Sequence, residues 1–504
     1  MAKHNMPVLV GVGQVVDHWR AEQGAAAAPS PLLLATIAAQ RALADTGSPG
    51  IAARIDTFAM ARTNETSYPG APQPNGVNAN LPGTLARTLD AQPADLILEI
   101  AGGQSPQALV NEMAARIHAG ESQCALVAGA EAIGATKAAR RGGVTLNWED
   151  DDPRPFEDRG HGPRMLTRSE AKHGLVVPAY FYALFQNALA HRRNETRTEH
   201  RAVMSHLFER FSQVAAANPY SQFPTARTAD WLATPSAENR PIADPFLKWH
   251  VAQDAVNMAA AILLVSEAKA DEWGIAPDKR VYLHGAGEAG DLQISERPKL
   301  DGSWAMDVAL NRALDQASLT PADIDLFDLY SCFPIAVMSA CDVLGIDYLA
   351  ETRPLTVTGG LPFFGGPGNN YSMHGIASMV DRVRAAPGAR GLVLANGGWM
   401  TKEAAGIYST ARPAAFTPAD PAAKATTSVP LAEAPTGGTL ETYTVVHGRD
   451  GPAKVIAFCR TAEDKRFIAT GDAPALEALS GEANRIGQPV TAVSQDETNT
   501  FSLA

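Results

Sequence analysis

The stretch GGLPFFGGPGNNYSMHGI, residues 359–376, decides the fold. Its glycines and prolines exclude regular structure up to Asn369, after which apolar residues recur at helical spacing as far as Val383. A glycine-rich turn that runs into a helix leaves backbone N–H groups free to bind an oxyanion or a phosphate. We therefore expect a ligand-binding helix N-terminus at this point.

The same arrangement occurs twice, which predicts an internal duplication. Each half has a strand, a glycine turn, a helix and a second strand with its own glycine turn. Strands that alternate with helices predict parallel sheets covered on both faces. Two such halves predict a pseudo-dimer with both glycine-led helix N-termini near a common axis. The helix 31–45 and the strand that starts at 55–58 recur as the helix 304–315 and the strand that starts at 324–327. The later segments are 96–100, 101–106, 107–119 and 125–131 in the first half, and 365–367, a helix through 384 and 391–398 in the second.

Several other segments complete the predicted core. Residues 8–10 are expected to form a buried strand that runs into a turn at 11–13, and residues 31–45 a helix with four apolar residues on its inner side. Residues 258–267 indicate a buried helix or strand. The polar stretch 134–247 is expected to be an inserted loop domain with one long helix over 201–216.

The domain organisation follows from these segments. The predicted domains are 1–270, which contains the insertion, then 271–412, a linker over 413–435 rich in Ala, Pro and Thr, and an additional domain over 436–504. In the last of these, residues 440–446 and 455–458 flank a turn, which predicts a hairpin in a small β-rich, barrel-like domain.

Composition excludes several function classes. The chain has 504 residues and a net charge of −12, which argues against a general nucleic-acid binder or a binder of anionic membranes. Its four cysteines show no metal-binding or disulfide pattern. No apolar run approaches the roughly 20 residues that cross a bilayer, and no signal pattern begins the chain. We expect a cytoplasmic α/β enzyme or a relative of one.

Five separated segments carry a family resemblance: Val127–Ala132, Asp254–Ala261, Tyr330–Phe333, Gly365–Pro367 and Asn396–Gly398. Over residues 5–412 the chain resembles the thiolase superfamily, which implies a five-layered αβαβα core built from two duplicated halves. Its tail is similar to that of the group called thiolase-like protein type 1, an oligonucleotide-fold type of barrel.

The resemblance implies altered chemistry. Thiolases use a nucleophilic cysteine at the first helix N-terminus, where this chain has Gly102. Their activating histidine corresponds to Gly366, and their acid/base cysteine to Asn396. Ordinary thiolysis is therefore disfavoured. The family also binds the thioester oxygen with two backbone N–H groups, here those of Gly102 and Gly398, and such donors contribute several kcal/mol.

Four side chains are candidates to replace the missing ones. Tyr330 is an acid or base if its surroundings depress its pKa, or a structural residue that ends a strand. Cys332 is either a reactive thiol or a buried apolar residue. His374 either points back into the pocket or only caps the helix or faces solvent. Asn396 either holds a water molecule or the thioester oxygen, or is a turn residue.

The resemblance places the coenzyme A against the insertion. There, His161, Arg164 and Arg168 lie in a loop broken by Gly and Pro, and are either CoA ligands or solvated side chains. No metal is expected.

The leading hypothesis is an acyl-CoA enzyme that makes or breaks a carbon–carbon bond beside the thioester, nominally an acetyl-CoA acetyltransferase in lipid metabolism. Retro-aldol cleavage suits the absence of a nucleophile. The alternative is a non-catalytic homologue that binds CoA or a lipid or supports a partner. A homodimer is expected, or a monomer if the additional domain covers the dimer face.

Overall fold

The computed structural model describes residues 5–504. Its first sheet has six strands in the order β1-β8-β4-β2-β3-β5. Strands β1, β8 and β4 pair antiparallel, whereas β4, β2, β3 and β5 pair in parallel. The prediction of parallel sheets therefore holds for β4, β2, β3 and β5 but not for β1 and β8, because β8 returns from the insertion without a helical crossover. The bounds are β1 Pro7–Val16, β2 Thr57–Met60, β3 Asp95–Leu98, β4 Cys124–Glu131, β5 Glu157–Asp158 and β8 Met258–Ser266.

The second sheet confirms the duplication. Its order is β10-β11-β12-β9-β13, in which β10-β11-β12-β9 repeats β2-β4-β8-β1 and β13 is added at the edge. Within residues 5–504 this half has no counterpart of β3. Instead, an irregular segment bonds to β10 through Phe327 N to Pro354 O (3.2 Å) and Leu329 N to Leu355 O (3.1 Å). The bounds are β9 Tyr282–Gly290, β10 Leu326–Leu329, β11 Arg390–Gly397, β12 Lys402–Ser409 and β13 Ala423–Lys424.

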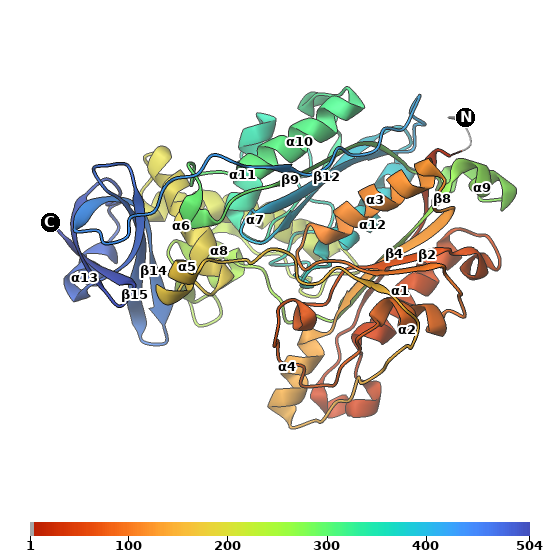
Figure 1. The fold of residues 1–504 in the computed structure, drawn as a ribbon, viewed down its shortest axis with the longest axis horizontal. Coiled ribbons are helices and arrows are strands. Elements are labelled where there is room, and N and C mark those ends of the chain that lie inside the picture. Colours follow the sequence, from red (N-terminus) through yellow and green to blue (C-terminus); the bar gives the residue numbers. More distant parts are fainter. Residues whose placement is uncertain (1–4) are drawn as a thin grey trace.

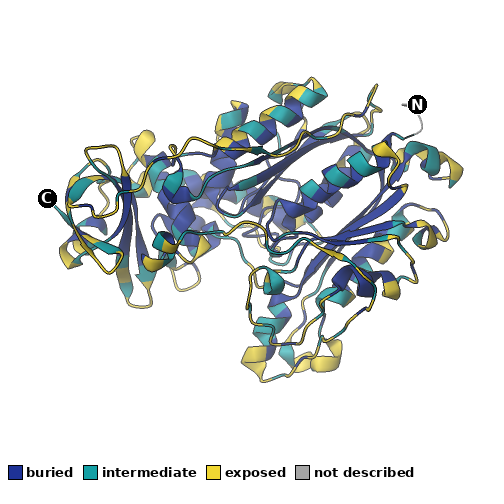
Figure 2. Ribbon diagram, in the orientation of Figure 1, coloured by how far each residue is buried: buried dark blue, intermediate teal, exposed yellow. Residues whose placement is uncertain are grey.

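Helices and sheets form five layers (Figure 1). Helices α3 and α12 lie between the two sheets, α1 and α2 cover the first sheet from outside, and α10 and α11 cover the second. The sheets and the two central helices are the most deeply buried elements (Figure 2). The bounds are α1 Pro31–Asp45, α2 Leu81–Thr88, α3 Ser105–Ala119, α10 Trp304–Ala317, α11 Pro334–Leu344 and α12 Tyr371–Ala385; the short α9 spans Glu267–Glu272.

Helix α1 shows how local sequence sets these layers. Ser30 Oγ accepts a hydrogen bond from Leu33 N and Pro31 occupies the first turn, so the helix begins where the sequence predicted. The predicted turn at residues 11–13 was wrong, because β1 runs straight through it. A Cβ at Gly11 would lie 2.1 Å from the Ala42 carbonyl oxygen, so the glycines allow α1 to pack directly on the strand.

The insertion contains more helix than expected. Besides the predicted long helix, α7, it contains α6, which packs next to the second half. Helix α6 buries residues around most of its circumference, so its sequence lacks a clear helical period. The bounds are α4 Ile133–Gly142, α5 Arg168–Lys172, α6 Pro178–Arg192, α7 Arg197–Ala217, α8 Ala229–Ala233, β6 Pro241–Ala243 and β7 Phe246–Leu247.

The C-terminal region forms a closed barrel, as predicted. Strand β14 pairs with both β15 and β17, which closes the ring β14-β15-β16-β18-β17. The barrel docks on the insertion: Asn187 Nδ2 donates to Tyr443 O (2.7 Å) and Thr442 Oγ1 to Leu184 O (2.6 Å). Its elements are β14 Gly437–Gly448, β15 Gly451–Arg460, β16 Arg466–Gly471, α13 Ala473–Leu479, β17 Pro489–Gln495 and β18 Thr498–Leu503.

None of the described helices is long and apolar enough to cross a membrane.

Candidate active site

The turn before α3 and the turn after β11 meet inside the molecule. A Cβ at Gly103 would lie 2.4 Å from both the Asn396 carbonyl oxygen and the Tyr330 hydroxyl. A Cβ at Gly397 would lie 3.2 Å from Gly103 N. The two halves therefore approach each other so closely that only glycine fits on both sides.

This meeting point leaves backbone donors without partners. Among residues 5–504, no hydrogen bond is found for the backbone N–H groups of Gly102, Gly103 or Gly398. Gly102 and Gly103 are buried, whereas Gly398 is half-buried, so the site reaches solvent on the side of Gly398. Orphaned buried N–H groups are rare in native proteins because each costs desolvation free energy. Such amides are suited to a ligand oxygen.

Three residues suggested by the sequence, Asn396, Cys332 and Gly398, lie on the side of this site that the second half forms, and Tyr182 connects two of them. Asn396 Nδ2 donates to the hydroxyl of Tyr182 (3.1 Å) and lies 3.8 Å from Cys332 Sγ. The Tyr182 hydroxyl in turn donates to the Gly398 carbonyl oxygen (3.1 Å). Tyr182 comes from α6, so the insertion contributes to the site.

The surroundings of Tyr330 and Cys332 oppose ionisation. Burial raises the pKa of Tyr330 well above its usual value, with the neighbouring Cys332 adding to the effect. Burial likewise raises the pKa of the Cys332 thiol, to about 12. Tyr330 was expected to act as an acid or base only if its pKa were depressed, and this condition is not met. Tyr330 and Cys332 both stay neutral near pH 7, and the Tyr330 hydroxyl is suited to donate a hydrogen bond.

A carboxyl group lies behind Asn396. Glu403 is the partner of Asn396 in the β11–β12 pairing, and both its carboxyl oxygens are buried without a hydrogen-bond partner. Burial raises its pKa well above the usual value, and the nearby positive charge of Arg297 only partly offsets this. Because Asn396 Oδ1 is also buried without a partner, this wall of the site contains more polar atoms than its own contacts satisfy.

His374 lies elsewhere. Its Nδ1 bonds to Gln14 Oε1 (2.9 Å), while its ring packs edge-on against Phe364. Burial lowers the pKa of His374 to about 3, so the ring is neutral. Tyr371 lies next to both Phe364 and Tyr330, with ring centroids 6.2 and 5.2 Å away respectively. The rings of Phe364 and Tyr371 thus lie between His374 and Tyr330.

The glycine stretch before α12 is occupied by structural contacts, contrary to expectation. Gly366 N donates to Gln253 O (2.8 Å) and Asn370 N to Pro367 O (2.7 Å). The side chains of Asn369 and Asn370 reach the first half, where they donate to Arg62 O and Gly129 O, each at 2.7 Å. This loop joins the two halves.

Two side chains that sequence reasoning missed fill the space beside Gly102. Gln104 Oε1 lies 2.1 Å and Lys402 Nζ 2.8 Å from the position of a Cβ at Gly102. Tyr182 and Glu403 were missed as well. The available signals were Lys402 and Glu403, two charged residues at the start of an otherwise apolar strand that follows a glycine turn. Nothing in its own sequence marks Tyr182, because it lies in the insertion.

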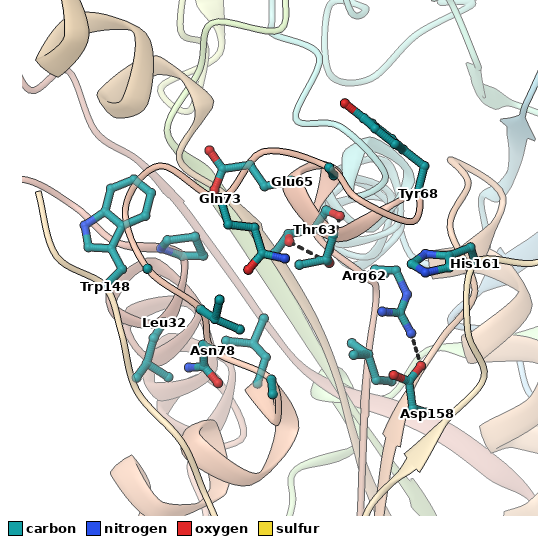
Figure 3. Close-up of a pocket in the computed structure, with 18 of the residues that line it drawn as sticks. Leu32, Arg62, Thr63, Glu65, Tyr68, Gln73, Asn78, Trp148, Asp158 and His161 are labelled. Atoms are coloured by element: carbon teal, nitrogen blue, oxygen red, sulfur yellow. Dashed lines mark hydrogen bonds and ion pairs between the residues drawn. The ribbon is translucent and has the colours of Figure 1, made fainter.

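The suggested CoA ligands do not gather at one place. His161 lines a cavity of about 380 Å³ at the carboxyl ends of β2 and β3, where Figure 3 shows it beside Arg62. In this view Trp148 lies on the opposite side, and Arg62 is joined to Asp158. Arg164 is exposed. Arg168 is also exposed and pairs with Glu497 of the barrel at 2.8 Å.

In the described part of the chain, no cluster of three or more His, Cys, Asp or Glu residues is suited to hold a metal ion.

Comparison with known proteins identifies the family. Residues 419–498 match the family described as the thiolase-like protein type 1 additional C-terminal domain. A monomeric SCP2-thiolase-like protein type 1 of Mycobacterium smegmatis is 35% identical, with a TM-score of 0.84 and complete coverage of both chains. The protein is thus a member of the thiolase superfamily by fold. Within it, the chain belongs to the thiolase-like protein type 1 family, with its additional C-terminal domain.

More distant relatives match only in part. Acetyl-CoA acetyltransferases of Methanocaldococcus jannaschii and Methanothermobacter thermautotrophicus are 28% identical over 132 and 247 residues, which are 26% and 45% of this chain. The chain covers 32% and 61% of the lengths of these two curated relatives.

Proposed function

We propose that the protein binds an acyl-CoA and makes or breaks a carbon–carbon bond beside the thioester carbonyl. The observation that carries this proposal is the set of unpaired amides at Gly102, Gly103 and Gly398, at the meeting point of the two halves. Amides fixed in this way stabilise an oxyanion without reorganisation, which is worth several kcal/mol per donor. Their presence favours a thioester oxygen as the bound group.

Thiolysis is not the reaction that this site favours. An acyl-enzyme needs a nucleophile, and position 102 is glycine. The nearby thiol of Cys332 stays protonated because burial raises its pKa to about 12. Retro-aldol cleavage of a β-hydroxyacyl-CoA needs no acyl-enzyme. The bond between C2 and C3 breaks, the hydroxyl becomes a carbonyl, and the thioester leaves as an enolate that is protonated at C2.

Tyr330 has a defined role in this proposal. Its hydroxyl lies against Gly103 and remains protonated, so it donates a hydrogen bond to the oxygen on C3 or to the thioester oxygen. Asn396 and Cys332 line the same site, and Asn396 is positioned by Tyr182. His374 has no part in this mechanism, because its ring bonds to Gln14 instead.

The second candidate is a homologue that binds CoA or a lipid without turnover. The observation in its favour is that Gln104 and Lys402 occupy the space beside Gly102, where the thioester would have to lie. Both atoms are tips of flexible side chains, and catalysis requires them to move aside.

The test measures turnover directly. The protein is incubated with acetoacetyl-CoA plus CoA and, separately, with β-hydroxyacyl-CoA esters, and the products are followed by mass spectrometry. We expect cleavage of the hydroxy ester, reduced at least tenfold in Tyr330→Phe and unchanged in the matched control Tyr220→Phe. Binding of both CoA esters without any product would instead establish the second candidate.

We also propose that the protein is a monomer in the cytoplasm. Strand β5 pairs with β3 and covers the edge of the first sheet. The barrel docks on the insertion at one end of the molecule (Figure 1). Of the suggested CoA ligands, His161 remains the candidate, because Arg168 is engaged by Glu497. Light scattering that gives twice the chain mass would contradict the monomer.

A further inference from the structure

An amine lies where the missing thiol would be. Lys402 begins β12, directly after the turn that contains Gly398, and its Nζ lies 2.8 Å from the position of a Cβ at Gly102. The amine donates to the Ala101 carbonyl oxygen, which fixes it against the first glycine turn. A side chain on residue 102 would therefore occupy the volume that now holds Lys402.

The charged groups around this amine are few. Glu99 is the one that acts on it directly, and Glu99 Oε2 is already paired with Arg159 at 2.6 Å. Arg159 also pairs with Glu112, and Glu288 of β9 is bonded to Asn111. Because the acidic neighbours have other partners, burial dominates and lowers the pKa of Lys402 to about 8, against the smaller raising effect of Glu99.

The three side chains suggested by the sequence, Tyr330, Cys332 and His374, do not change charge near neutral pH. Burial raises the pKa of Tyr330 well above its usual value and that of Cys332 to about 12, and it lowers the pKa of His374 to about 3. An efficient acid–base group titrates near the working pH. Lys402 is also half-buried, so it lies on the solvent-facing side of the site together with Gly398.

We propose that Lys402 replaces the missing cysteine as the reactive side chain of this site, as an unprotonated amine that carries the proton of a retro-aldol cleavage. This inference rests on the proposed lyase function. The amine takes the proton from the hydroxyl on C3, the C2–C3 bond breaks, and the ammonium returns the same proton to C2 of the enolate. The products are a carbonyl compound that contains C3 and an acyl-CoA that keeps C1 and C2. No other reactant is consumed, so one proton carrier is sufficient.

The first experiment titrates the amine without any substrate. Reductive methylation with formaldehyde and cyanoborohydride is run at a series of pH values, and the labelling of each lysine is measured by peptide mass spectrometry. Lys402 is expected to reach half its maximal labelling rate near pH 8, with the exposed Lys465 as the internal reference. If Lys402 and Lys465 label with the same pH dependence, Lys402 is an ordinary cation that only holds the Ala101 carbonyl, and the proposal is overturned.

The second experiment uses variants that separate charge from basicity. Lys402→Met retains the length of the side chain, and Lys402→Arg keeps a charge that cannot be lost. We expect both to lower cleavage of β-hydroxyacyl-CoA roughly 100-fold or more, and to remove a limb near pH 8 from the pH dependence of kcat/KM. Lys465→Met is the matched control and should retain the wild-type profile. Full activity of Lys402→Met would overturn the proposal.

Failure of the two proposals can be told apart. A wild-type protein that cleaves the ester while Lys402→Met retains full activity refutes the role of Lys402 and keeps the lyase. A wild-type protein that cleaves nothing refutes the lyase, and with it the proton transfer by Lys402. In that case a titration of Lys402 near pH 8 would still establish the reactive amine.

Discussion

The two glycine-led helix starts of the duplicated halves differ in what their polar groups do. Before α12, backbone amides bond within the loop and to Gln253, and two asparagine side chains reach into the first half. Before α3, the amides of Gly102 and Gly103 have no partner among the described residues. The turn before α3 also contacts the second half, through the carbonyl oxygens of Ala101 and Gly103, which accept from Lys402 Nζ and Ser372 Oγ. The two turns therefore differ in their N–H groups, because those of Gly102 and Gly103 stay unpaired.

The largest expected effect tests the joining turn. Asn369→Ala with Asn370→Ala should lower the free energy of unfolding by about 3–5 kcal/mol, because it leaves the Arg62 and Gly129 carbonyl oxygens buried without these donors. Urea unfolding followed by circular dichroism measures this loss.

Gln104→Ala is the matched change at the other turn. Its amide oxygen has no partner, so we expect a loss below about 1 kcal/mol. Equal losses at the two turns would remove the distinction between them.

The second prediction concerns acid stability on the α12 side. Because the pKa of His374 is about 3 in the folded protein and near 6.5 when unfolded, the unfolded state binds more protons between these values. Stability should therefore fall as the pH drops from 6.5 to 4, by on the order of 2–3 kcal/mol from this residue. The decline should be shallower in His374→Gln, and an identical slope in the variant would argue against a buried neutral ring.

The third prediction concerns stability at alkaline pH and the contribution of Lys402, which contacts the turn before α3. Because the folded pKa of Lys402 is about 8 and lies below the unfolded value, the unfolded state binds more protons above pH 8. Stability should therefore rise between pH 8 and 10, by about 1 kcal/mol after allowance for the partial exposure of this residue. Lys402→Met should lose this rise relative to Lys465→Met, measured by urea midpoints across the range.

The smallest effect concerns access to the site. Because the tip of Gln104 fills the space beside Gly102, Gln104→Ala should bind a short acyl-CoA a few-fold more tightly than the wild type, as measured by calorimetry. Weaker binding would indicate that Gln104 contacts the ligand instead of obstructing it.

Much of the fold could be predicted from the sequence. Helix α1 and strand β4 fall where apolar spacing places them, and the repeat of strand, glycine turn and helix indicated the duplicated core. Strand β1 was interpreted as ending at Gly11, because the glycines that admit α1 look like a turn in sequence. Helix α6 was missed since burial on most sides removes the helical period.

The candidate site was less accessible to sequence reasoning. Turn glycines and motif positions located Gly102, Asn396 and Gly398, and the structure brings these together. His374 was misplaced because its position in the first turn of α12 does not reveal that its ring packs towards Gln14. Lys402 was missed because its proximity to Gly102 arises only when the two halves pack.

The most direct test is a crystal structure with S-acetonyl-CoA, a ketone analogue whose carbon–sulfur bond cannot be cleaved by thiolysis. We predict that its carbonyl oxygen accepts hydrogen bonds from the N–H group of Gly398 and from that of Gly102 or Gly103, with Gln104 displaced. Binding of the analogue elsewhere, with Gln104 and Lys402 still filling the space beside Gly102, would contradict it.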